Sequence, residues 1–229
     1  MSRQQGGRVA GSDVLRALAG DAMTLCGGRP RAILGIAGTP GAGKSTLATL
    51  LCQRVADVWG ADTVCHLPMD GFHLADAQLR RLGLLERKGA PETFDPYGYA
   101  HLLDRVRHDL EVDIYAPGFD RALEQPLAGA IAVAPATRLV VTEGNYLLHA
   151  DLPWRRARAL MDGVWFVTAE HQTRLDRLIA RHIEFGKTPQ QARAWVAKVD
   201  EGNAEQVAAT ATAADRVVIN GVHGWALAA

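Results

Sequence analysis

The chain has few cysteines, no excess of charge of either sign and no long apolar run. Its 229 residues include three cysteines, and 25 basic side chains balance 25 acidic ones. Three widely spaced thiols predict neither a disulfide framework nor a zinc cluster. A formal net charge of zero gives no electrostatic reason to expect nucleic acid or an anionic membrane as a partner. The longest uncharged run, residues 125–137, contains two prolines and is too short to cross a bilayer.

Length and composition are typical of one globular domain. Hydrophobic residues make up 48% of the chain and charged residues 22%, an ordinary profile for a protein with a substantial core. Residues 1–11 carry basic side chains without an apolar segment, so we expect a flexible lead and no secretory signal. Ser12 is expected to cap the first helix, and residues 12–229 to form a single domain in a cytoplasmic protein with reduced thiols.

Short apolar runs alternate along the chain with segments of helical spacing. The apolar runs are typical of buried parallel strands. The five expected strands span residues 32–37, 63–67, 139–142, 164–168 and 217–219. The expected helices span residues 12–25, 44–58, 99–110, 170–184 and 190–213. This order predicts an α/β fold with a doubly wound five-stranded parallel sheet and helices on both faces, which binds ligands at the carboxyl ends of its strands.

The first apolar run leads into a complete phosphate-binding motif, G-x-x-x-x-G-K-S, at residues 38–45. Glycines let the backbone turn its N–H groups toward phosphate oxygens, and the next helix adds the positive end of its dipole. Lys44 is expected to reach the β- and γ-phosphates, and Ser45 to hold Mg²⁺. The expected nucleotide-binding residues are Gly38, Thr39, Pro40, Gly41, Ala42, Gly43, Lys44, Ser45 and Thr46. The alternative, an ordinary glycine-rich turn, is disfavoured because a strand precedes the motif and a helix follows it.

Two carboxylates follow other apolar runs of the predicted sheet. Glu143 ends the third run, in the position of an acid that binds Mg²⁺ directly or through water. Asp70 follows the second run and is the candidate base, which accepts the proton of an acceptor hydroxyl. His73, three residues later, is a candidate contact to the acceptor. The alternatives are a solvated acid at Glu143, a turn aspartate at Asp70 and a surface residue at His73.

The helix after the fourth run carries Arg174, Arg177 and Arg181 on one stripe, three and four residues apart. Arginines in a closing lid neutralise a transferring phosphoryl group and exclude water. We expect such a lid at about residues 174–190, with Arg177 and Arg181 as the catalytic candidates. The alternative is a solvated charged face.

The helix after this lid is predicted to begin with a capping box, at Thr188 and Gln191. Asn203 then falls on its apolar side and needs hydrogen-bond partners there. It either contacts a ligand or bonds to nearby backbone, and we favour the second.

Beyond these residues, four segments resemble the P-loop kinase family that contains uridine kinase, phosphoribulokinase and bacterial type I pantothenate kinase. Besides the phosphate-binding motif, they are residues 69–73 (M-D-G-F-H), 86–95 (E-R-K-G-A-P-E-T-F-D), 115–121 (Y-A-P-G-F-D-R) and 141–148 (V-T-E-G-N-Y-L-L). The similarity covers most of the chain from about Ala32 onward. It implies a P-loop NTPase fold, with Asp70 at the position of the catalytic aspartate and Arg177 and Arg181 in the lid.

The resemblance implies a kinase that uses ATP and Mg²⁺, and the chain has no N-K-x-D guanine-reading sequence. The acceptor would be a small hydroxyl-bearing metabolite: a nucleoside, a sugar or a pantothenate-like alcohol. Candidate acceptor contacts are Arg87, Lys88, Tyr115 and Arg121, with surface charge as the alternative for the basic pair Arg87 and Lys88. The rival hypothesis is a regulatory ATPase or nucleotide-binding module without a small acceptor, and a third is a kinase that has lost catalysis. A homodimer remains open.

Overall fold

The computed structural model describes residues 11–228, with side chains from Asp13 onward. The predicted flexible lead therefore lies outside the described residues, apart from Gly11, which begins helix α1 (Gly11–Thr24). The predicted cap at Ser12 also falls outside, because the side chain of Ser12 is not described.

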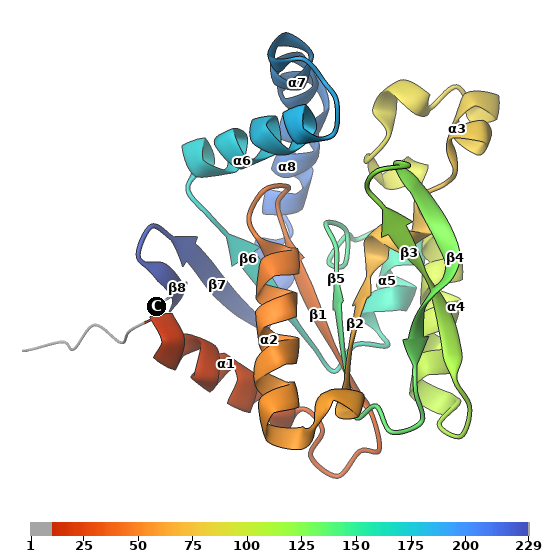
Figure 1. Ribbon diagram of the computed structural model, residues 1–229, viewed down its shortest axis with the longest axis vertical. Coiled ribbons are helices and arrows are strands. Elements are labelled where there is room, and N and C mark those ends of the chain that lie inside the picture. The colour runs from red at the N-terminus through yellow and green to blue at the C-terminus, as the bar shows by residue number, and fades with distance from the viewer. Residues whose placement is uncertain (1–10, 229) are drawn as a thin grey trace, which may run out of the picture.

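A central sheet of six strands organises the described residues, in the order β2-β5-β1-β6-β7-β8 (Figure 1). The five parallel strands are β1 (Ala32–Gly38), β2 (Val64–Pro68), β5 (Leu139–Glu143), β6 (Gly163–Thr168) and β7 (Arg216–Gly221). They coincide with the predicted strands to within two residues at either end. The predicted number of strands in this sheet, five, was wrong, because β8 (Gly224–Leu227) extends the sheet as an antiparallel sixth strand after a tight turn. Four residues are too few for a periodic signal.

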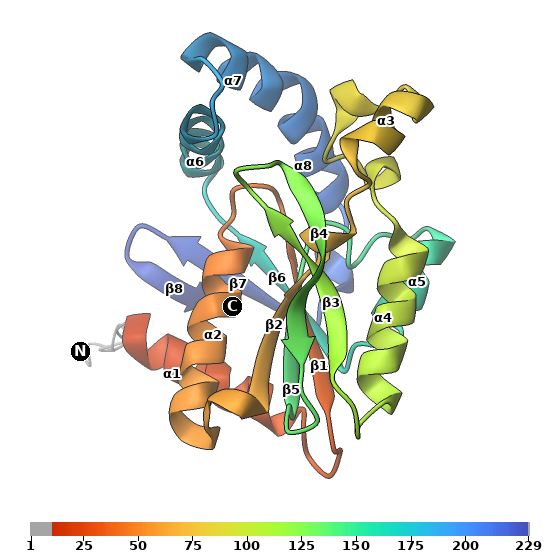
Figure 2. The same ribbon diagram turned by 45° about the vertical axis from the view of Figure 1, so that its right-hand side comes forward.

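A separate antiparallel pair, β3 (Ile114–Asp120) and β4 (Gln125–Val133), packs beside β2 and is a second departure from the prediction. It stands in front of the central sheet in Figure 2. Both strands contain proline and glycine, which are typical of loops, and most residues of β4 are exposed. β3 alternates in burial from Ile114 to Gly118, but proline and glycine interrupt the apolar pattern of both strands, so the pairing could not be recognised in the sequence.

The helices confirm the α/β alternation, with shifted ends. They are α2 (Lys44–Trp59), α3 (Asp76–Leu82), α4 (Pro96–His108), α5 (Leu152–Arg158), α6 (His171–Glu184), α7 (Pro189–Trp195) and α8 (Glu201–Ala208). The predicted capping box is present, since Gln191 N–H donates to Thr188 Oγ1 at 3.3 Å and Thr188 N–H to Gln191 Oε1 at 2.9 Å. The single helix predicted for residues 190–213 is present from Pro189 to Ala208, with a π-helical turn at Val196–Asp200 between α7 and α8, but it ends five residues earlier than predicted. Such turns often mark functional sites.

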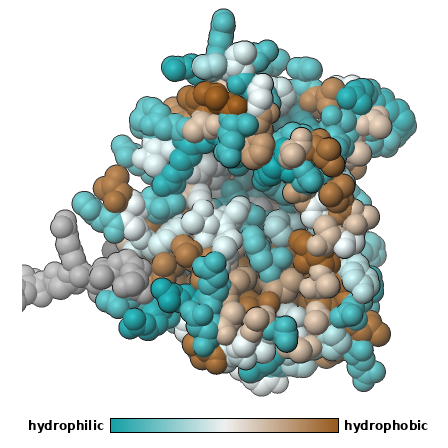
Figure 3. All heavy atoms as spheres, in the orientation of Figure 1, coloured by the Kyte–Doolittle hydropathy of each residue, from teal (hydrophilic) through white to brown (hydrophobic). Residues whose placement is uncertain are grey.

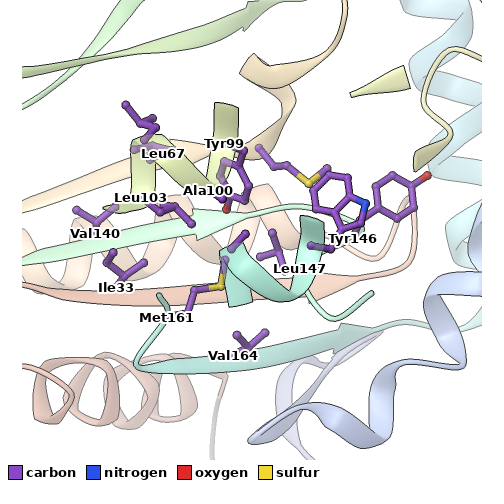
Figure 4. Close-up of a cluster of buried hydrophobic side chains, with 14 of the residues drawn as sticks. Ile33, Leu67, Tyr99, Ala100, Leu103, Val140, Tyr146, Leu147, Met161 and Val164 are labelled. Carbon is purple, nitrogen blue, oxygen red and sulfur yellow. The ribbon is translucent and has the colours of Figure 1, made fainter. Parts of the chain in front are cut away.

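Helices cover both faces of the sheet, as Figures 1 and 2 show, and each face has its own core. On one face, Leu34 and Ile36 of β1 pack with Leu47 of α2. On the other, Ile33 packs with Val140 and with Leu103 of α4 (Figure 4). Because successive residues of a strand point to opposite faces, a strand buried on both faces reads as a continuous apolar run.

The upper end of the molecule in Figure 1 carries two projections above the carboxyl ends of the strands. One consists of α6, α7 and α8, and the other of α3 with the short turns that follow it. Within residues 11–228, no helix is both long and apolar enough to cross a bilayer.

Candidate active site

The phosphate-binding loop between β1 and α2 has the backbone that its glycines predict. Gly41 and Gly43 have φ values of 77° and 100°, in the left-handed region that favours glycine. A Cβ added at Gly43 would lie 2.3 Å from Asn220 Nδ2, and one at Gly41 would lie 2.8 Å from the carbonyl oxygen of Arg174. Both positions therefore exclude larger residues.

Side chains outside the loop hold its carbonyl oxygens. Arg174 Nη1 donates to the Pro40 carbonyl at 2.9 Å, and Asn220 Nδ2 donates to the Ala42 carbonyl at 2.9 Å. Arg177 Nη1 lies 3.4 Å from the Gly41 carbonyl. With these carbonyls tied to the surrounding protein, the loop is preorganised for an anion. Sequence reasoning missed Asn220, although its place directly after the fifth apolar run was a usable signal.

Lys44 is buried at the start of α2, with 8% of its surface exposed. Its amine donates to the Thr39 carbonyl at 3.2 Å. Burial lowers the pKa of Lys44 to about 8, against the opposing effects of Glu143 and Asp70. Thr39 Oγ1 is also buried and has no hydrogen-bond partner among the described residues. A buried cation and an unpaired hydroxyl beside a preformed loop fit the phosphates of a nucleotide.

Glu143 and Ser45 meet at the carboxyl end of β5. Ser45 Oγ donates to Glu143 Oε1 at 2.9 Å, and the glutamate is 5% exposed. Burial and the nearby charge of Asp70 raise the pKa of Glu143. The described residues contain no cluster of three or more His, Cys, Asp or Glu side chains that could hold a metal alone. A serine hydroxyl and a carboxylate fit Mg²⁺, which keeps water and phosphate oxygens as its other ligands.

Asp70 lies in a 3₁₀ turn directly after β2, on the same edge of the sheet. Its Oδ2 is 2.6 Å from Nη2 of Arg121, and 26% of its side chain is exposed. Burial alone would raise the pKa of Asp70, but the charges of His73, Arg121 and Lys44 outweigh burial and hold the pKa below its ordinary value. Nδ1 of His73 lies 2.8 Å from the Asp70 carbonyl oxygen, and burial lowers the pKa of the imidazole.

A cavity of about 370 Å³ connects the phosphate-binding loop to these groups. In Figure 3 the surface is hollowed below the two upper projections. The structure brings most of the predicted site residues to its wall. Those that line it are Pro40, Gly41, Lys44, Ser45, Asp70, His73, Lys88, Arg121, Glu143 and Arg181.

Two predicted acceptor contacts lie away from the cavity lining. The side chain of Arg87 is 62% exposed and pairs with Glu92 at 2.7 Å. Tyr115 is 63% exposed near the start of β3, four residues before Phe119, which does line the cavity. Arg177 is exposed and lies against the outside of the phosphate-binding loop.

Lys88 joins two walls of the cavity. Its amine donates to Asp76 Oδ1 of α3 at 2.7 Å and to the carbonyl oxygen of Glu124, in the turn between β3 and β4. It also lies 5.6 Å from the centre of the Phe119 ring. With its charge engaged by Asp76, Lys88 contributes to the shape of the cavity.

The predicted lid region forms the wall opposite α3. His182 Nε2 lies 2.8 Å from Asp200 Oδ2, which ties α6 to the π-helical turn. Asn203 Nδ2 donates to the Gly89 carbonyl at 3.3 Å and also lines the cavity. Its predicted backbone bond is therefore present. Asp200 was missed by sequence reasoning, and the π-helical turn that places it leaves no sequence signal.

Comparisons with known proteins find kinases among the relatives of this chain. No protein-family model matches the chain. A candidate uridine kinase of Schizosaccharomyces pombe is 35% identical over 169 residues, 72% of each chain. The solved structure of a candidate fructose transport system kinase from Silicibacter sp. TM1040 is 33% identical, covers 92% of this chain and 99% of its own, and has a TM-score of 0.79. The structure of YFH7 from Saccharomyces cerevisiae, a candidate P-loop kinase, is 18% identical and has the same fold, with a TM-score of 0.78 over 90% of this chain and 98% of its own.

The chain therefore belongs to the P-loop kinases of the uridine kinase and pantothenate kinase type.

Proposed function

We propose that the protein transfers the γ-phosphoryl group of Mg²⁺-ATP to a hydroxyl of a small metabolite. The observation that carries the proposal is the placement of Asp70, Lys44 and Glu143 around one cavity at the carboxyl ends of β1, β2 and β5. A P-loop protein that only binds a nucleotide needs the phosphate loop and an acid such as Glu143. It does not need a second carboxylate facing the same cavity.

Each group has a role that follows from its chemistry. Lys44 and the loop bind the phosphates, and Ser45 with Glu143 would hold Mg²⁺, which supplies charge neutralisation when bound. Asp70 accepts the proton of the acceptor hydroxyl and directs its lone pair toward phosphorus. Arg181, on the lid side of the cavity, offers positive charge to the transferring group. Most of the rate enhancement would come from positioning and preorganised charge.

Three acceptor classes fit a hydroxyl-directed base: a sugar, a nucleoside and a pantothenate-like alcohol. We place sugars first, because the solved structure named as a fructose transport system kinase matches this chain over nearly the whole length of both proteins. The cavity wall also offers several carboxylate and amide groups that can bind hydroxyls. They are Glu86, Asn145, Asp200 and Asn203.

Acceptor-stimulated formation of ADP tests the proposal. The protein would be incubated with Mg²⁺-ATP and one member at a time of a panel of sugars, nucleosides and pantothenate. We expect one acceptor to accelerate ADP formation and to gain the mass of one phosphoryl group. Slow hydrolysis that no acceptor stimulates would favour the regulatory ATPase, and the absence of both ATP binding and hydrolysis would favour a kinase that has lost catalysis.

A further inference from the structure

We propose that Arg121 guards Asp70 against water until the acceptor is bound. In this view the guanidinium of Arg121 pairs with the carboxylate while the acceptor is absent, and the acceptor displaces it. Transfer to water is suppressed and transfer to the acceptor is not. The inference rests on the proposed function, because it takes Asp70 to be the base. It starts from the contact of 2.6 Å between Arg121 Nη2 and Asp70 Oδ2.

The pairing matters because any kinase with bound ATP can lose its phosphoryl group to water. In that reaction a water oxygen forms a bond to the γ-phosphorus while the bond to the β,γ-bridging oxygen breaks, and ADP leaves with the electron pair. A base that takes the water proton accelerates the step. A charge-assisted hydrogen bond from an arginine occupies one carboxylate oxygen and makes both oxygens less basic. The pair therefore weakens Asp70 as a base toward water.

The local fold delivers Arg121 to this position. Arg121 is the first residue after β3, in the turn that joins β3 to β4. Asp120 Oδ1 accepts the N–H groups of Ala122 at 2.8 Å and Leu123 at 2.9 Å, which fixes the turn next to the arginine. The guanidinium carbon also lies 5.0 Å from the centre of the Phe119 ring, so the ring supports the side chain.

The far side of the turn is anchored as well. Glu124 has a φ of 53°, a backbone conformation that residues other than glycine seldom adopt. Its carbonyl oxygen accepts a hydrogen bond from Lys88, which is itself held by Asp76. Strain of this kind persists where surrounding contacts impose it. The turn is thus built to keep Arg121 beside Asp70 in the absence of a ligand.

The same geometry lets the acceptor open the pair. The Arg121 side chain is 39% exposed, so it can leave Asp70 without disturbing the core. Because the two side chains touch, an acceptor whose reactive hydroxyl bonds to Asp70 presents its neighbouring oxygen to Arg121. The guanidinium then exchanges the carboxylate for an acceptor oxygen, and the base is freed where the phosphoryl group is to be received.

The test measures ATP hydrolysis without acceptor and transfer with acceptor in Arg121→Met. We expect hydrolysis without acceptor to rise about tenfold, from the greater basicity of an unpaired carboxylate, while kcat/KM for the acceptor falls. Arg121→Lys keeps a charge but loses the planar fork, and should lie between Arg121→Met and the unsubstituted protein in both rates. Arg105→Met is the matched control, since Arg105 pairs with Asp109 at 3.0 Å on the exposed surface of α4. Both rates should be unchanged in it.

A purely structural role for Arg121 predicts that both reactions fall together, which would overturn the proposal. The double variant Asp70→Asn with Arg121→Met separates the remaining outcomes. Loss of the raised hydrolysis in the double variant supports the guard, because the gain then depends on Asp70. Raised hydrolysis that survives in the double variant overturns the guard, because the gain then does not depend on Asp70. Unchanged hydrolysis in Arg121→Met overturns the proposed role of Arg121. The proposed kinase activity still stands in that case, provided that Asp70→Asn blocks transfer to the acceptor.

Discussion

Each end of the central sheet buries a charged side chain, but the two side chains differ in how many hydrogen bonds the protein offers them. At the amino end, Arg31 precedes β1 and is 2% exposed. Its guanidinium donates three hydrogen bonds of 2.8 Å, to the carbonyl oxygens of Val106, Ala134 and Thr137. At the carboxyl end, Lys44 is nearly as buried, yet its amine makes a single bond of 3.2 Å within the described residues.

The acidic groups follow the same division. Asp162, at the amino end, accepts from the Ile33 N–H at 2.8 Å and from Arg107 at 2.9 Å. Asp70, at the carboxyl end, pairs with one partly exposed arginine. Buried polar groups in native proteins are hydrogen-bonded, so the ones left short of partners mark places where a ligand completes the set. The comparison therefore predicts that substitutions at one end change stability and those at the other change ligand binding and catalysis.

Among substitutions at the carboxyl end of the sheet, Lys44→Ala should impair ATP binding and phosphoryl transfer most severely. We expect phosphoryl transfer to fall by about 10³-fold or more, because the phosphates lose the buried cation that faces them. ATP binding, followed by calorimetry, should fall below detection. The free energy of unfolding should not decrease, since an incompletely paired buried charge is removed. Normal ATP affinity in this variant would contradict the assignment.

Asp70→Asn should separate binding from chemistry. Removing a general base slows transfer by about 10²–10⁴-fold, while we expect the affinity for Mg²⁺-ATP to change little, because the Asp70 carboxylate pairs with Arg121 and not with the phosphate-binding loop. Single-turnover transfer and equilibrium binding measure the two effects. If the variant transfers at a near-normal rate, another group is the base.

Arg31→Met, at the amino end of the sheet, should lower stability and leave ligand binding intact. The carbonyl oxygens of Val106 and Thr137 would lose the guanidinium donor, and that of Ala134 would keep only the Thr137 N–H, which together costs about 3 kcal/mol in the free energy of unfolding. Denaturant unfolding measures this loss. ATP affinity of the folded protein should be unchanged. A variant of normal stability and weakened ATP binding would erase the distinction between the two ends.

The pH dependence of ATP binding tests the charge on Lys44. Its pKa is lowered to about 8, so the amine is charged below this pH and loses its proton above it. At pH 9 about a tenth of the free protein would carry the charge, and the apparent affinity should fall by up to about tenfold. Titrations between pH 6.5 and 9.5 measure it, and an affinity that stays constant up to pH 9.5 would contradict the prediction.

Asn220→Ala should give the smallest effect. The Ala42 carbonyl would lose its hydrogen bond of 2.9 Å, and a bond of this kind contributes about 1 kcal/mol, or roughly fivefold in ATP affinity. Asn145→Ala is the matched control, because Asn145 lines the cavity beside Glu143 and makes no hydrogen bond to the loop carbonyls. It should leave ATP affinity unchanged.

The carboxyl-end residues were the more predictable part of the molecule. The strand, the phosphate-binding motif and the helix are contiguous, so local sequence specifies Lys44 and Ser45. Asp70 and Glu143 each follow a buried apolar run, and the topology of a parallel sheet brings the ends of such runs together. The five parallel strands were predictable because each is a short continuous apolar run.

The acceptor side was less predictable because its residues come from turns and a bulged hairpin. Tyr115 is exposed because its neighbours Ile114 and Ala116 are buried on the opposite face of β3. A register shift between Ala116 and Gly118 then changes the pairing before Arg121 is reached. Arg87 and Lys88 are adjacent in a short turn, and only tertiary contacts decide which of them enters the cavity.

The fate of the γ-phosphoryl group tests the central claim most directly. ATP labelled with ¹⁸O in the γ-phosphoryl group would be incubated with the protein, Mg²⁺ and each acceptor of the panel, and the label followed by mass spectrometry. We predict labelled phosphoryl on a hydroxyl of one acceptor in the unsubstituted protein and its loss in Asp70→Asn. Label that appears only in inorganic phosphate, whichever acceptor is present, would contradict the proposed kinase activity.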